Sequence, residues 1–166
     1  MTGSSGLWRS LTAALHQILS ILLCISVLIL VIPVTLQIFS RFTELIPHYI
    51  WTEEMARFLF VWMVMIGAMV GVRESAHFNV DLWPPGRPRL TAVINLITRL
   101  AILVFAVTFV IAGWEFTLFG WNRISELAEL PLWMIHIAWP LTGFVWIVFS
   151  GEQVLDDVRA LAGGTR

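Results

Sequence analysis

Charged side chains stand at both ends of an apolar stretch between residues 51 and 81, and they are the groups in this chain best placed to do chemistry. Ionised groups within a membrane must pair with one another, reach the interface or line an ion pathway. None of these groups falls at the centre of the stretch, so the pattern predicts polar contacts that fix the ends of a membrane helix. The charged groups are Glu53, Glu54, Arg57, Arg73, Glu74, His77 and Asp81.

A later stretch repeats the same spacing of charges. Arg57 and Arg73 lie sixteen positions apart, as do Arg99 and Glu115, and a helix rises about 24 Å over that distance, less than the roughly 30 Å hydrocarbon core. In an antiparallel helix pair Arg57 and Glu115 would share one depth, so we predict a contact between them, with Glu54 adding an attraction to Arg57. The alternative is that each group reaches the interface independently.

Gly67 and Gly71 are four positions apart in the middle of the first stretch. Small residues at this spacing let helix backbones approach closely in lipid, where packing drives association. The spacing is common in membrane helices by chance. Beside the flanking arginines, it predicts that this helix contacts another one.

Prolines and tryptophans add expectations about packing. Pro33 and Pro140 fall inside apolar stretches, where a missing backbone donor predicts a kink. Trp62, Trp139 and Trp146 lie deeper than the interface that tryptophans favour, so we expect them to fill gaps against neighbouring helices or lipid.

The histidines offer little support for a redox or metal site. A bis-histidine haem needs two imidazoles at one depth on facing helices, and only His48 and His136 share the predicted outer side. Cys24 is the single cysteine, and no histidine, cysteine and carboxylate cluster has metal-ligand spacing. Without a nucleophile elbow, a phosphate-binding loop or a carboxylate dyad, the sequence predicts no enzyme, no cofactor and no metal.

Four long apolar stretches must position these residues. The chain has 166 residues, of which 58% are hydrophobic and 13% charged, a composition that excludes a soluble domain. A membrane-spanning helix needs about 20 mostly apolar residues, which predicts an all-α integral membrane protein with four transmembrane helices at 15–39, 55–72, 90–119 and 132–149. We expect a cytoplasmic or interfacial segment at 1–14, a four-helix membrane domain at 15–150 and a cytoplasmic tail at 151–166.

The arginines predict the orientation of the spans. With four spans, the N-terminus, the second loop and the C-terminus share one side, which holds Arg9, Arg73, Arg87, Arg89, Arg159 and Arg166. The opposite side holds Arg41, Arg57 and Arg123. Basic residues favour the cytoplasmic side, so both termini are predicted to be cytoplasmic, and the loops at 42–52 and 120–131 to face outward.

The placement of polar groups also bears on transport. A carrier's own site needs polar groups or broken helices near the membrane midplane, and this chain is poor in both. The sequence therefore favours a partner of a transport machine over the machine itself. Two alternatives stay open: a stand-alone four-helix carrier or channel, such as a small multidrug exporter that would use Glu115, and a haem- or quinone-binding membrane anchor.

Five fragments, in order along nearly the whole chain, resemble one family: the small, DctQ-like membrane subunit of tripartite ATP-independent periplasmic (TRAP) transporters. The second fragment, at 51–62, matches the family's most distinctive stretch. The fragments are 37–42 with Arg41, 51–62 with Glu53, Glu54, Arg57 and Trp62, 67–81 with Arg73, His77 and Asp81, 130–133, and 140–144.

The resemblance implies a role that composition could not supply. It implies sodium-driven uptake of carboxylates by a periplasmic binding protein, a large elevator-type membrane subunit and a small subunit that braces the large subunit's scaffold and helps dock the binding protein. The implied partners are these two proteins and membrane lipids, with no nucleic acid, in the bacterial inner membrane. Structural or interface roles are expected for Arg41, Glu53, Glu54, Arg57, Trp62, Gly67, Gly71, Arg73, His77, Asp81 and Glu115.

His136 departs from the family pattern, which leads us to expect tyrosine or another aromatic residue at this position. We expect the imidazole to lie at the outer interface, either as a simple interfacial side chain or in contact with the binding protein.

Overall fold

The chain is helical along most of its length. The computed structural model describes residues 3–43, 49, 51–74 and 88–163, and the side chains of 7–43, 49, 51–74 and 97–154. Within these residues the helices are α1 (Gly3–Phe42), α2 (Trp51–Glu74), α3 (Pro88–Gly120), α4 (Trp133–His136) and α5 (Ala138–Gly163). Four segments are long and apolar enough to cross a membrane: Leu7–Phe42, Trp51–Glu74, Ile97–Gly120 and Trp133–Val154. The predicted all-helical, four-span fold is confirmed.

The fourth span is divided into two helices near one end. α4 ends at His136 and α5 begins at Ala138, with Ile137 between them. Pro140 has no backbone N–H to donate to the His136 carbonyl, so the hydrogen-bond ladder is interrupted there. The kink predicted at Pro140 therefore takes the form of a break, whereas α1 continues through Pro33.

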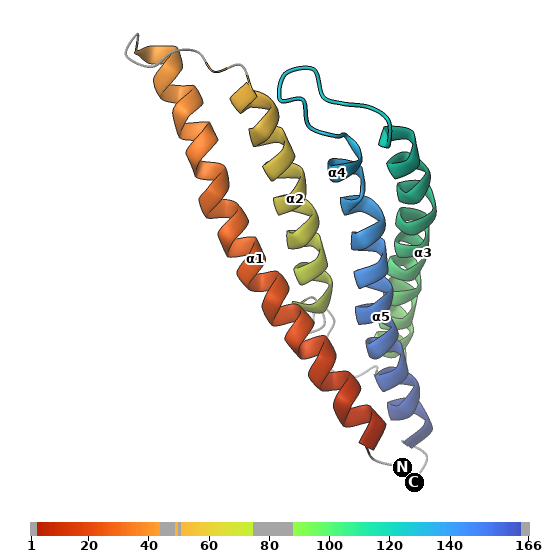
Figure 1. The fold of residues 1–166 in the computed structure, drawn as a ribbon. Helices are drawn as coiled ribbons and strands as arrows, with labels where there is room; N and C mark the ends of the chain where they lie inside the picture. The colour runs from red at the N-terminus through yellow and green to blue at the C-terminus, as the bar shows by residue number, and fades with distance from the viewer. Residues whose placement is uncertain (1–2, 44–48, 50, 75–87, 164–166) are drawn as a thin grey trace.

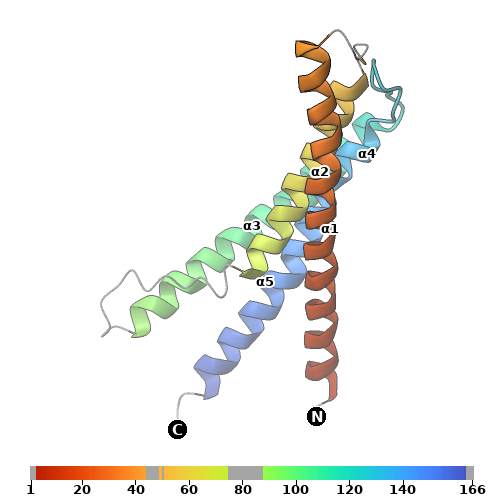
Figure 2. The ribbon, with the colours of Figure 1, turned by 90° about the vertical axis from the view of Figure 1, so that its left-hand side faces the viewer.

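The spatial order of the helices differs from their order along the chain. α5 lies between α2 and α3, and α1 packs on the other side of α2 (Figure 1). Their axes cross, with α3 strongly inclined to α1 (Figure 2). The start of α1 and the end of α5 lie at one end of the molecule, and the loop between α3 and α4 lies at the other (Figure 1).

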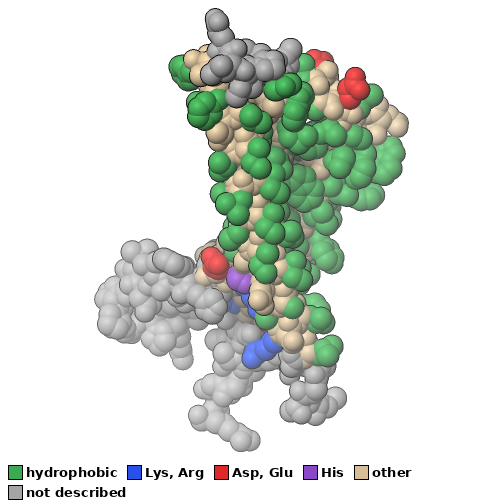
Figure 3. Space-filling view, turned by 60° about the vertical axis from the view of Figure 1, so that its left-hand side comes forward, with side chains coloured by type: hydrophobic (Ala, Val, Ile, Leu, Met, Phe, Trp, Pro, Cys, Tyr) green, Lys and Arg blue, Asp and Glu red, His purple; other side chains and the backbone are tan. Residues whose placement is uncertain are grey.

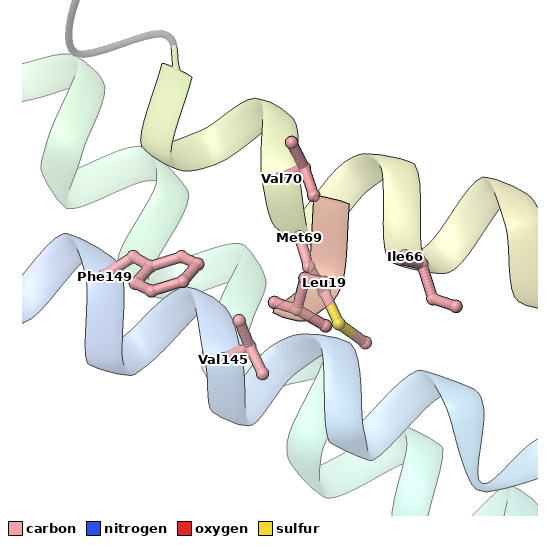
Figure 4. Close-up of a cluster of buried hydrophobic side chains, with 6 residues drawn as sticks. All are labelled: Leu19, Ile66, Met69, Val70, Val145 and Phe149. Atoms are coloured by element: carbon pink, nitrogen blue, oxygen red, sulfur yellow. The ribbon is translucent and has the colours of Figure 1, made fainter. Parts of the chain in front are cut away.

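A small hydrophobic cluster joins three of the helices. Leu19 comes from α1, Val145 and Phe149 from α5, and the remaining side chains, Ile66, Met69 and Val70, from α2 (Figure 4). Since lipid chains are as apolar as these residues, the contact holds through close packing rather than through exclusion of water. α2 contributes three of these six side chains and packs against both α1 and α5.

Much of the remaining apolar surface faces outward. Hydrophobic side chains cover the middle of the face in Figure 3, with charged side chains gathered towards its two ends. Leu28 and Ile32 of α1 and Val104 and Ile111 of α3 are among the large exposed side chains. This distribution suits a protein whose surroundings are lipid or other membrane helices.

α1 is longer than a single membrane crossing requires. Its 40 residues extend about 60 Å at the rise of an α-helix, against a hydrocarbon core of roughly 30 Å. The helix has no break near residue 14, so the expected N-terminal segment is continuous with the first span. The position of that segment relative to the membrane stays a prediction.

Candidate functional site

A hairpin at residues 121–132 closes the end of the molecule away from the chain termini. Its two arms are joined by backbone hydrogen bonds from Ser125 to Leu130 at 2.8 Å and from Leu132 to Arg123 at 2.9 Å. Glu129 turns the chain with a φ of 52°, a left-handed conformation uncommon outside glycine. With so few bonds between its arms, a short hairpin is marginally stable by itself, and it needs support from the helices.

Glu54, in the first turns of α2, provides that support. Its Oε2 atom accepts hydrogen bonds from the Ser125 hydroxyl at 2.8 Å, the Leu127 amide at 3.0 Å and the Ala128 amide at 2.6 Å. The Ser125 hydroxyl oxygen also accepts a bond from the Leu130 amide at 3.3 Å. One carboxylate oxygen therefore holds the turn and, through Ser125, the returning arm.

Two further contacts fix the stem of the hairpin. The indole N–H of Trp62 donates to the Met134 carbonyl at 3.0 Å, which ties α4 to α2. Trp121 and Trp133 pack against each other at the base of the two arms, with ring centroids 5.5 Å apart and ring planes inclined by 32°. The deep position of Trp62 predicted a space-filling role, and the structure adds a hydrogen bond that depth alone could not reveal.

His136 lies inside the molecule rather than at its surface. Only 8% of its area is exposed, and its ring stacks on Phe116 at 3.8 Å between centroids. Its Nδ1 lies 3.0 Å from the Phe116 carbonyl oxygen, so the tautomer that carries the proton on Nδ1 donates to α3. Because the ring packs directly against Gly120, a Cβ atom there would overlap it. The expectation of an interfacial or partner-facing His136 is therefore wrong, and the residue joins α3 to α4.

α2 also receives polar side chains along the rest of its length. Gln37 of α1 donates to the Thr52 carbonyl at 2.8 Å, and Trp146 of α5 donates to the Ala68 carbonyl at 2.9 Å. At the opposite end, Gln153 donates to the Val72 carbonyl at 3.3 Å. These bonds attach both neighbours to the α2 backbone.

Polar contacts also gather where α1, α2 and α5 meet at the end that carries the chain termini. His16 Nε2 lies 3.6 Å from Glu74 Oε1, a distance that makes an ion pair when the imidazole is protonated. The Arg73 guanidinium lies over the Phe149 ring, 5.2 Å from its centroid, in cation–π geometry. Arg73 therefore contacts α5 within this chain, and its expected structural or interface role stays a prediction.

The predicted contact between Arg57 and Glu115 is wrong. Both side chains are exposed, and in the described residues no ion pair or hydrogen bond joins them. The physical reason is the helix order, since α3 packs on α5 and α4 rather than on α2. Among the described residues no ion pair joins Arg57 to Glu54 either, and the attraction expected between them along α2 stays a prediction.

Within this chain, the closest helix approaches occur at glycines other than Gly67 and Gly71, whose expected interface roles stay predictions. A Cβ at Gly67 would lie an ordinary 3.7 Å from Leu23, and one at Gly71 would have no neighbour within 4 Å. A Cβ at Gly143 of α5 would instead lie 2.6 Å from the Ala106 carbonyl oxygen of α3, and one at Gly113 would lie 2.8 Å from Pro140. No two glycines of α3 or α5 are four positions apart, so the sequence pattern did not indicate this tight contact.

The remaining residues with an expected structural or interface role are either exposed or outside the part of the chain that the structure describes. Arg41, in the last turn of α1, and Glu53, in the first turn of α2, are exposed. His77 and Asp81 lie outside the described residues, as does His48, which the haem alternative requires.

Two buried hydroxyl groups within the spans bond to the backbone of their own helices. Thr117 and Thr142 are buried and donate to the carbonyls four positions earlier, at Gly113 and Ala138. In the described part of the chain, no three histidine, cysteine or carboxylate residues cluster where they could hold a metal ion. Other polar side chains in the described part of the chain link helices to one another or to the hairpin, namely those of Gln37, Glu54, Trp62, Trp146 and Gln153.

These features define a class: a membrane protein of four spans in which polar side chains cross-link helices and anchor a terminal hairpin. The family model for the DctQ component of tripartite ATP-independent periplasmic transporters matches residues 30–160. The chain belongs to this family of small TRAP transporter subunits. It is a multi-pass protein of the bacterial inner membrane.

Individual relatives agree with this assignment. The chain is 27% identical over 120 residues to the sialic acid TRAP transporter small permease protein SiaQ of Vibrio cholerae, a match that covers 69% of this chain and 66% of the relative. It is 32% identical over 156 residues to the C4-dicarboxylate TRAP transporter small permease protein DctQ of the same organism, with 69% and 67% covered. The chain thus spans about two thirds of the length of either relative.

Proposed function

We propose that this chain is the non-catalytic small membrane subunit of a sodium-coupled TRAP transporter. In this role it packs beside a large elevator-type membrane subunit, braces the immobile scaffold of that subunit and contributes to the surface that docks a periplasmic binding protein. The chain itself carries neither substrate nor sodium.

The observation that carries the proposal is the way four polar side chains cross-link the helices. Gln37, Glu54, Trp62 and Trp146 each connect α2 to another part of the chain. A carrier's own site requires polar groups that remain available to a substrate near the midplane. Cross-linked helices with extensive apolar exposure instead suit a rigid element that packs against other membrane helices.

The orientation follows from the arginine distribution. We place both termini in the cytoplasm and the 121–132 hairpin on the periplasmic side, because basic residues favour the cytoplasmic face. This puts the hairpin on the side where a periplasmic binding protein arrives.

The substrate class rests on the relatives. The sialic acid and C4-dicarboxylate transporters named above both handle carboxylates, and we propose a carboxylate for the transporter of this chain as well.

Complex formation tests the proposal. The chain is expressed with a C-terminal tag together with the large subunit and is purified in mild detergent. The mass of the purified species is then measured by native mass spectrometry. We expect a one-to-one complex that survives size-exclusion chromatography. Purification of the chain alone, with the large subunit in a separate peak, would count against it.

A further inference from the structure

The geometry of the 121–132 hairpin points to a specific role for one residue. We propose that Glu54 is a positioning residue that holds this hairpin in the shape required to dock the periplasmic binding protein. The inference rests on the proposed function and adds to it the group on which docking depends.

The strength of the attachment comes from the charge on Glu54. An ionised carboxylate is an acceptor only, and hydrogen bonds to a charged acceptor are roughly twice as strong as those between neutral groups. Here three donors, Ser125, Leu127 and Ala128, converge on a single oxygen atom. The two backbone amides come from the turn of the hairpin, so their attachment fixes the path of the main chain and not only one side chain.

The attachment leaves the outer side chains of the hairpin available to a partner. Ile124 and Leu127 are 65% and 48% exposed, and Glu126 and Glu129 are exposed beside them. Interfaces between proteins that associate and separate are about as apolar as the rest of the surface and have a polar rim, which is compatible with this mixture of side chains. The hairpin lies at the end of the molecule opposite the start of α1 and the end of α5 (Figure 1), which is the periplasmic side in the proposed orientation.

Loss of the attachment would lower the fraction of molecules in which the hairpin has the conformation that docks the binding protein, and docking would weaken in proportion. When only a fraction of molecules holds the binding-competent conformation, the apparent dissociation constant rises by the inverse of that fraction. A hairpin that is ordered in one molecule out of ten would bind about tenfold more weakly. The packing of α1, α2 and α5 lies elsewhere in the molecule, so the arrangement of the membrane helices would be retained.

Glu54→Ala tests this role, and the adjacent Glu53 provides the matched control. Glu53 is an exposed carboxylate in the same helical turn, and in the described residues no hydrogen bond joins it to the hairpin. Each variant is purified as the complex with the large subunit in nanodiscs. Hydrogen exchange of the Leu127 and Ala128 amides is measured, together with the dissociation constant for the purified, substrate-loaded binding protein.

For Glu54→Ala we expect exchange at both amides to accelerate at least about tenfold and the binding protein to dissociate several-fold more readily, with the complex intact. Glu53→Ala, which removes no bond to the hairpin, should match the wild type in amide exchange. Ser125→Ala, which changes only the loop, should show the same two effects to a smaller degree.

Three results would overturn the inference. Unchanged amide exchange in Glu54→Ala would mean that the carboxylate does not hold the hairpin. Faster exchange with unchanged affinity would mean that the hairpin does not dock the binding protein. Loss of the complex in Glu54→Ala, with normal docking in Ser125→Ala, would make Glu54 an assembly residue. If the wild-type complex itself did not bind the binding protein, the proposed docking function would fail instead.

Discussion

The indole N–H of Trp146 in α5 donates a hydrogen bond to the backbone carbonyl of Ala68 in α2, at 2.9 Å. The bond joins residues 78 positions apart and, with that of Gln153 to Val72, attaches the fourth span to the second. Such links are what a rigid bracing subunit requires.

Replacement of Trp146 by phenylalanine keeps an aromatic ring and removes the donor. We expect the free energy of unfolding to fall by about 0.6–1.5 kcal/mol, the range for interhelical hydrogen bonds. Trp114→Phe is the control, because Trp114 is exposed on α3. The measurement is unfolding in mixed micelles with increasing denaturing detergent. Equal midpoints for the two variants would show that the bond adds no stability.

Gly143 and Gly151 make a matched pair on α5. Alanine at 143 would place its Cβ against the Ala106 carbonyl oxygen and the Val110 nitrogen of α3, whereas alanine at 151 would have no neighbour within 4 Å. We expect Gly143→Ala to destabilise the protein by about 1–3 kcal/mol, because the α3 backbone must move. Gly151→Ala should be neutral or stabilising by up to about 1 kcal/mol. The same unfolding assay decides, and similar losses at both sites would contradict the α3–α5 packing.

Gly120 and His136 should be energetically coupled. Alanine at 120 would overlap the His136 ring and displace it from Phe116, so Gly120→Ala should be destabilising while His136 is present. In a His136→Ala background the same substitution should cost much less, since the space has been vacated. A double-mutant cycle measures the coupling, which we expect to exceed about 1 kcal/mol. Additive effects would mean that the two residues do not touch.

The hairpin and the start of α1 should lie on opposite sides of the membrane. In a Cys24→Ser background, Glu126→Cys should react with a membrane-impermeant maleimide in cells whose outer membrane has been opened. Leu7→Cys should react only after the inner membrane is also permeabilised. The reverse pattern would invert the proposed orientation and remove the hairpin from the periplasm.

The hydropathy of the sequence predicted the number of spans, because each stretch must by itself be long and apolar enough to cross the membrane. The break at Ile137 was partly foreseeable, since Pro140 cannot continue the hydrogen-bond ladder. The spatial order of the helices was not foreseeable, because short loops allow several arrangements of four apolar helices. That order is why Arg57 and Glu115, predicted to meet, do not.

The candidate site was predicted only in part. Glu54 was identified as a structural residue, but its partner Ser125 is 71 positions away in a loop without periodicity. His136 was expected at the surface, because a polar ring near a helix end normally faces water. Only the tertiary structure brings Phe116 and Gly120 beside it.

Sodium-driven uptake in proteoliposomes tests the central claim most directly. Vesicles contain the large subunit alone, this chain alone, or both, and receive a substrate-loaded binding protein and a sodium gradient. The account predicts uptake only when both subunits are present and none from this chain by itself. Uptake by this chain alone would make it a carrier, and full uptake by the large subunit alone would show that no bracing subunit is needed.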